Sequence, residues 1–101
     1  MSVYGVIVIR ESHYCTPFDI PKDVYHFGIE AVCNSHEDAE KMIEELINSK
    51  KYFPHNLEKY HQIELAHSSG KILAWDDGRS DFDDHHVWYK IRYSIIGKEL
   101  A

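Results

Sequence analysis

Apolar residues recur at helical spacing between residues 36 and 49, and this pattern restricts the fold more than any other feature of the chain. Ser35 precedes the pattern and is followed three residues later by Asp38, an arrangement that resembles a capping box with a shorter acid. Acidic residues in the first turns also suit the positive end of a helix dipole. We therefore predict a helix over residues 36–49 that packs through one face, formed by Ala39, Met42, Ile43, Leu46 and Ile47.

Two strand-like segments precede this helix. Residues 3–14 are rich in β-branched and aromatic side chains and leave neither face polar, which predicts a central strand. Residues 16–22 contain Pro17 and Pro21, which favour a loop because proline cannot donate a ladder hydrogen bond. Residues 24–33 then alternate, and we expect an antiparallel hairpin whose second strand directs one set of side chains to one side: Tyr25, Phe27, Ile29, Ala31 and Cys33.

The second half of the chain is rich in predicted strands. Residues 62–74 resemble two short strands around Gly70, although a helix over residues 56–67 is an alternative, and residues 52–60 fit a helix or a loop. Alternation from Val87 to Ile95 predicts a final strand. The expected fold is a single α+β domain over residues 1–101, in which an antiparallel sheet of four or five strands carries one main helix on one face.

One short helix cannot cover a wide sheet. The opposite face, which carries part of residues 3–9 together with Trp88, is therefore expected to meet a partner protein or a second copy in a homodimer.

Composition limits the classes of function. The chain has 101 residues, 17 acidic against 11 basic side chains, and a net charge of -6, which argues against direct nucleic-acid binding and favours basic protein partners. The apolar run at residues 3–9 is too short for a membrane span and lacks the basic leader of a signal peptide, so we expect a cytoplasmic protein. Cys15 and Cys33 are expected to be free thiols.

Residues 75–86 contain five aspartates and two histidines, opposed only by Arg79. Such a segment binds a cation, imitates the charge of a nucleic-acid backbone, or forms a solvated loop. Aromatic side chains among the carboxylates suggest a protein-binding surface, since aromatic anchors supply affinity and charge supplies orientation. The predicted partner-binding residues, which would engage the basic surface of a larger protein, are Trp75, Asp76, Asp77, Asp81, Phe82, Asp83, Asp84 and Trp88.

The same segment offers an enzymatic alternative. If it runs extended, Asp81, Asp83 and His85 fall on one side at a two-residue period and form a candidate site for a divalent metal ion. A metal-dependent hydrolase or nuclease would follow from such a site. The spacing matches neither an EF-hand nor a zinc motif, and no other cofactor is expected, because the dispersed glycines form no phosphate-binding loop.

Residues 4–10 read Tyr-Gly-Val-Ile-Val-Ile-Arg, and residues 28–46 join an apolar strand to the capped helix that begins with His-Glu-Asp-Ala-Glu. In these two stretches the chain resembles small acidic ββα proteins of bacteriophages and mobile elements, a class that includes anti-CRISPR inhibitors. The resemblance implies a non-enzymatic inhibitor that blocks the basic nucleic-acid-binding surface of a host defence enzyme. Immunity proteins and antitoxins use the same physical principle and stay open as alternatives.

Overall fold

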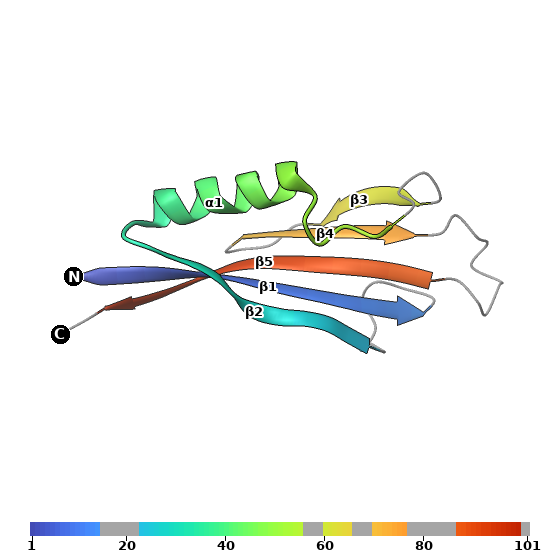
Figure 1. Cartoon of the computed structure of the whole chain (residues 1–101), viewed down its shortest axis with the longest axis horizontal. Coiled ribbons are helices and arrows are strands. Elements are labelled where there is room, and N and C mark those ends of the chain that lie inside the picture. Colours follow the sequence, from blue (N-terminus) through green and yellow to red (C-terminus); the bar gives the residue numbers. More distant parts are fainter. Residues whose placement is uncertain (15–22, 56–59, 66–69, 77–86, 100–101) are drawn as a thin grey trace.

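The protein's structure, a computed structural model, describes residues 1–14, 23–55, 60–65, 70–76 and 87–99. Within these ranges the chain forms a five-stranded antiparallel sheet in the order β2-β1-β5-β4-β3 and one helix that packs against it, as the α+β prediction required (Figure 1). The elements in chain order are β1 (Ser2–Tyr14), β2 (Asp23–Cys33), α1 (His36–Ser49), β3 (His61–Leu65), β4 (Gly70–Asp76) and β5 (Val87–Glu99).

The first and last strands lie at the centre of the sheet. β1 and β5 pair without interruption from Ser2 opposite Glu99 to Tyr14 opposite Val87. The predicted hairpin of β1 and β2 is confirmed, and so are the two strands around Gly70, which pair as β3 and β4. Residues 61–65 are therefore strand rather than the alternative helix.

Gly70 begins β4 at a position that only glycine fits. Its φ is +148°, and a Cβ atom there would lie 1.8 Å from the backbone oxygen of Tyr93 on β5. A side chain would push the two strands apart, so the close approach of β4 to β5 depends on this residue.

Both ends of α1 are capped by local interactions. The Ser35 hydroxyl accepts a hydrogen bond of 3.1 Å from the backbone N–H of Asp38, which confirms the N-terminal cap. At the other end Lys50 adopts the left-handed conformation, with φ of 57°, and its N–H donates to the Ile47 oxygen. The helix predicted over residues 36–49 therefore forms with its predicted bounds.

The core lies between α1 and one face of the sheet. Ala39, Ile43 and Leu46 are buried on the helix, as expected from their spacing. They meet alternate residues of the three central strands, since successive strand side chains point to opposite faces. The buried strand residues of this cluster are Val6, Val8, Leu73, Trp75, Ile91, Tyr93 and Ile95.

The predicted alternation of β2 does not hold along the whole strand. Ala31 and Cys33 pack against the core, whereas Phe27 and Ile29, expected on the same side, are 71% and 69% exposed. The reason is a β-bulge at Glu30: Val6 pairs with Ala31, but the next residue, Ile7, pairs with Ile29. One extra residue moves Ile29 and Phe27 to the opposite face, and a second register shift, between Arg10 and Glu11, sets Val24 on that face as well, opposite Glu11.

Among the described residues, no helix combines the length and apolar character needed to cross a membrane.

Candidate functional site

Most of the acidic surface predicted from the sequence lies outside the described residues. This holds for Asp77, Asp81, Phe82, Asp83 and Asp84, and for His85 of the candidate metal site. The acidic binding surface and the Asp81-Asp83-His85 metal site therefore stay predictions. In the part of the chain that the structure describes, no three His, Cys, Asp or Glu side chains gather in a way that could hold a metal ion.

Three of the predicted binding residues are described. Asp76 is half-buried at the end of β4, where it pairs in register with His61 on β3 and with Trp88 on β5. Trp75 is 1% exposed, and its ring lies 4.6 Å from that of Phe53, which follows α1. Trp88 is 8% exposed. Both indoles are thus buried in the described conformation, and Trp75 serves the core that joins α1 to β4.

A different surface has the character of a binding site. On β2, four apolar side chains are between 56% and 71% exposed, although residues of this type are ordinarily among the most buried. They pair in register with Glu11, Ile9, Ile7 and Gly5 of β1, which alternate with the core residues Val6 and Val8. The four side chains therefore point away from α1, and they are Val24, Phe27, Ile29 and Val32.

Two further isoleucines extend this surface onto the next strand. Ile7 and Ile9 are half-buried on β1, directly beside Ile29 and Phe27. We call the six residues Ile7, Ile9, Val24, Phe27, Ile29 and Val32 the apolar face. Ile96, 56% exposed on β5, lies at its end, because Ile96 and Val32 both pair with Gly5. A continuous apolar surface of this kind is typical of a protein-interaction site.

An ion cluster borders the apolar face on the same side of the sheet. Oε1 of Glu11 lies 3.2 Å from Nζ of Lys90 and 3.3 Å from Nε of Arg92. The Glu11 and Lys90 side chains are 4% and 5% exposed, so each charge is compensated within the protein rather than by water. The charge of Glu11, which lies beside Val24, is therefore compensated by Lys90 and Arg92.

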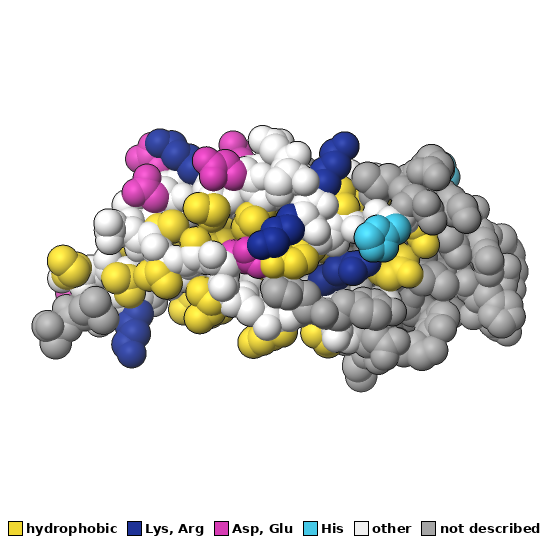
Figure 2. All heavy atoms as spheres, viewed as in Figure 1, with side chains coloured by type: hydrophobic (Ala, Val, Ile, Leu, Met, Phe, Trp, Pro, Cys, Tyr) yellow, Lys and Arg dark blue, Asp and Glu magenta, His cyan; other side chains and the backbone are white. Residues whose placement is uncertain are grey.

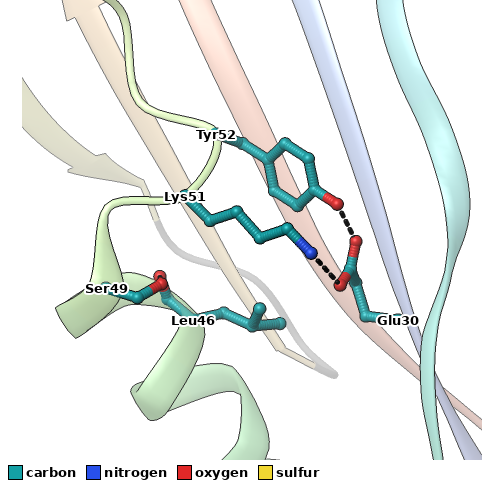
Figure 3. A network of polar contacts seen from close by, with 5 residues as sticks. All are labelled: Glu30, Leu46, Ser49, Lys51 and Tyr52. Atoms are coloured by element: carbon teal, nitrogen blue, oxygen red, sulfur yellow. Dashed lines mark hydrogen bonds and ion pairs between the residues drawn. The ribbon is translucent and has the colours of Figure 1, made fainter.

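The bulge that exposes Phe27 and Ile29 is held from the helix side of the sheet. Glu30 accepts a hydrogen bond from the hydroxyl of Tyr52 and lies 3.3 Å from Nζ of Lys51 (Figure 3). Burial, together with the hydrogen bond to Glu30, raises the pKa of Tyr52 above its usual value. The hydrogen bond to Glu30 likewise raises the pKa of Lys51. The segment after α1 is thus fastened to the bulge of β2.

Acidic side chains gather on the outer side of α1 (Figure 2). They are exposed, and two of them have partners one turn away along the helix: Glu37 forms a weak ion pair with Lys41 at 3.7 Å, and Oε1 of Glu40 lies 2.8 Å from Nδ1 of His36. The molecule therefore presents a negatively charged helix on one side of the sheet and the apolar face on the other. The exposed acidic residues are Glu37, Asp38, Glu40, Glu44 and Glu45.

Comparisons with models of protein families, with curated proteins and with solved structures find no significant match to this chain.

The sequence did not identify the apolar face, because its alternation assigned Phe27 and Ile29 to the same side as Ala31 and Cys33. The only signal was that β2 is apolar apart from Asp23, His26, Gly28 and Glu30, and carries no proline or lysine, the residues that often protect an edge strand.

Proposed function

We propose that this chain is a non-enzymatic protein-binding domain that acts through the apolar face. The observation that supports the proposal is the exposure of Phe27 and Ile29, at 71% and 69%, at the middle of β2. Large apolar side chains in the centre of a surface patch supply most of the affinity of protein interfaces. Fully burying such a side chain contributes about 1.5 to 3 kcal/mol of transfer free energy, and most of this is not supplied by contacts among the described residues, because each side chain stays about 70% exposed.

The charge distribution supports a second binding surface for a basic partner. The outer side of α1 presents five exposed carboxylates, and the sequence adds five aspartates in residues 75–86. Together they would attract a positively charged surface and accelerate association with it. A basic groove that ordinarily holds nucleic acid has this chemistry, so an inhibitor of the anti-CRISPR kind, an immunity protein or an antitoxin is the second candidate function.

Site-specific photo-cross-linking in cells tests the two surfaces in one experiment. A photoreactive phenylalanine derivative replaces Phe27 on the apolar face, Gln62 on β3, or Asp83 in the acidic segment. Gln62 is the matched control, because it is also an exposed strand residue but lies on the helix side of the sheet, outside both proposed surfaces. We expect a discrete cross-linked protein product from position 27 and only background from position 62.

The outcomes separate the candidates. A product from position 83 whose yield falls with added salt would support the basic partner, since salt screens exposed charges. If position 27 gives no more product than position 62, the apolar face is not a binding surface and the main proposal fails.

A further inference from the structure

We infer that a second copy of this chain occupies the apolar face, and that the two copies pack face to face about a two-fold axis beside Gly28. This inference rests on the proposed function and names the partner of the same surface. A two-fold axis makes the surface complementary to itself. A residue on one side of the axis therefore faces, in the second copy, the residue that lies at the same distance on the other side.

The exposed residues of β2 have this symmetry. Phe27 and Ile29 lie one residue on either side of Gly28, and Val24 and Val32 lie four residues on either side. When two β2 strands lie antiparallel about Gly28, Phe27 meets Ile29 of the second copy and Val24 meets Val32. The exposures of the partners also match, at 71% with 69% and at 56% with 66%.

The neighbouring strand has the same centre. Gly28 pairs in register with Val8 of β1, and Ile7 and Ile9 flank Val8 symmetrically. A single axis therefore sets apolar side chains against apolar side chains along both strands. A two-fold dimer of sheets requires apolar residues at equal distances on either side of one centre. A partner of unrelated sequence would not require this arrangement.

The size and charge of the surface suit a dimer. The exposed parts of the six side chains amount to on the order of 600 Å² per copy, close to the roughly 800 Å² that each partner buries in a standard interface. None of the six is charged, and the adjacent Glu11 is compensated by Lys90 and Arg92 at 3.2 and 3.3 Å. Two copies with a net charge of -6 each can thus approach through this face, while their acidic helices point outward.

The first test is the mass of the purified full-length chain in solution, by light scattering or sedimentation equilibrium. We expect a dimer, twice the 11.9 kDa of the single chain. The variant Phe27→Glu should halve the measured mass, because it places two carboxylates in the interface. Gln62→Glu adds the same charge at an exposed position of β3 on the helix side and should stay dimeric, with circular dichroism confirming that both variants are folded.

The second test examines the register without disturbing the interface by charge. In a background with Cys15→Ala and Cys33→Ala, chains with Phe27→Cys are mixed with chains that carry Ile29→Cys and treated with a short bifunctional maleimide. We expect the mixture to cross-link several-fold faster than either protein alone, because the axis places position 27 opposite position 29.

A monomer at every concentration, or a dimer that persists in Phe27→Glu, would overturn the inference. A monomer whose position 27 still cross-links to a different protein in cells would leave the proposed function standing, so the two failures are distinguishable. Equal cross-linking rates in the mixture and in the separate proteins would refute the axis beside Gly28.

Discussion

At the scale of single residues, burial separates side chains that look alike in the sequence. Trp75, next to the run of aspartates, was expected on the surface, yet it is 1% exposed because β4 directs it towards Phe53 and α1. Tyr93 is also 1% exposed, and its hydroxyl has no hydrogen-bond partner among the described residues. Such differences depend on contacts between distant segments, which local sequence patterns do not encode.

The buried hydroxyl of Tyr93 leads to a prediction about stability. Burial raises the pKa of Tyr93, so above pH about 10 the unfolded chain releases this proton while the folded chain keeps it, and stability falls with rising pH. Tyr93→Phe removes an unsatisfied polar group and should raise the free energy of unfolding by about 1 kcal/mol at neutral pH. It should also reduce the fall in the free energy of unfolding between pH 7 and values above pH 10, as measured by urea denaturation at both.

Tyr52→Phe is the matched control for this substitution. It removes the same atom, but one that donates to Glu30, and should lower the free energy of unfolding by about 1 kcal/mol. If Tyr93→Phe destabilised the protein as much as Tyr52→Phe does, the Tyr93 hydroxyl would have a partner in solution and the prediction would be wrong.

At the scale of elements, periodicity predicted which segments form strands and helix but not which face the middle of β2 presents. The bounds of α1 and the pairing of β1 with β2 follow from local spacing and turn residues. The bulge at Glu30 does not, because it is set by the register with Val6 and Ile7 and by contacts with Tyr52 and Lys51. The exposed side of β2 therefore required the three-dimensional structure.

The C-terminal end of α1 gives a prediction at this scale. Lys50 is the only non-glycine residue with positive φ in the described part of the chain. Lys50→Gly relieves the clash of Cβ in this conformation and should stabilise the protein by about 0.5 to 1 kcal/mol in thermal or urea unfolding. Lys41→Gly, the same change inside the helix, should instead destabilise it by about 1 kcal/mol. Equal losses from both substitutions would show that Lys50 is not strained.

At the scale of the whole molecule, the sequence predicted the fold class, an uncovered sheet face and an acidic surface. It placed part of residues 3–9 and Trp88 on the uncovered face, and Ile7 and Ile9 do lie there. The most exposed apolar side chains, however, lie on β2, and Trp88 is only 8% exposed. The acidic residues 77–84 and the metal set that includes His85 lie outside the described residues and stay predictions. Net charge and apolar content can be counted from the sequence. The placement of acidic side chains on α1 and of the apolar face on the opposite side of the sheet arises only on folding.

The central claim is that protein covers the apolar face, and the oxidation of Phe27 by hydroxyl radicals in living cells measures this most directly. Phe27 is 71% exposed in the single chain, so an uncovered face would be oxidised rapidly. The reference is purified Ile29→Glu, in which a charge at the centre of the face keeps it open. We predict that Phe27 of the native chain in cells is oxidised several-fold more slowly than in this reference. Equal rates would contradict the account, because the apolar face would then be exposed to water where the protein acts.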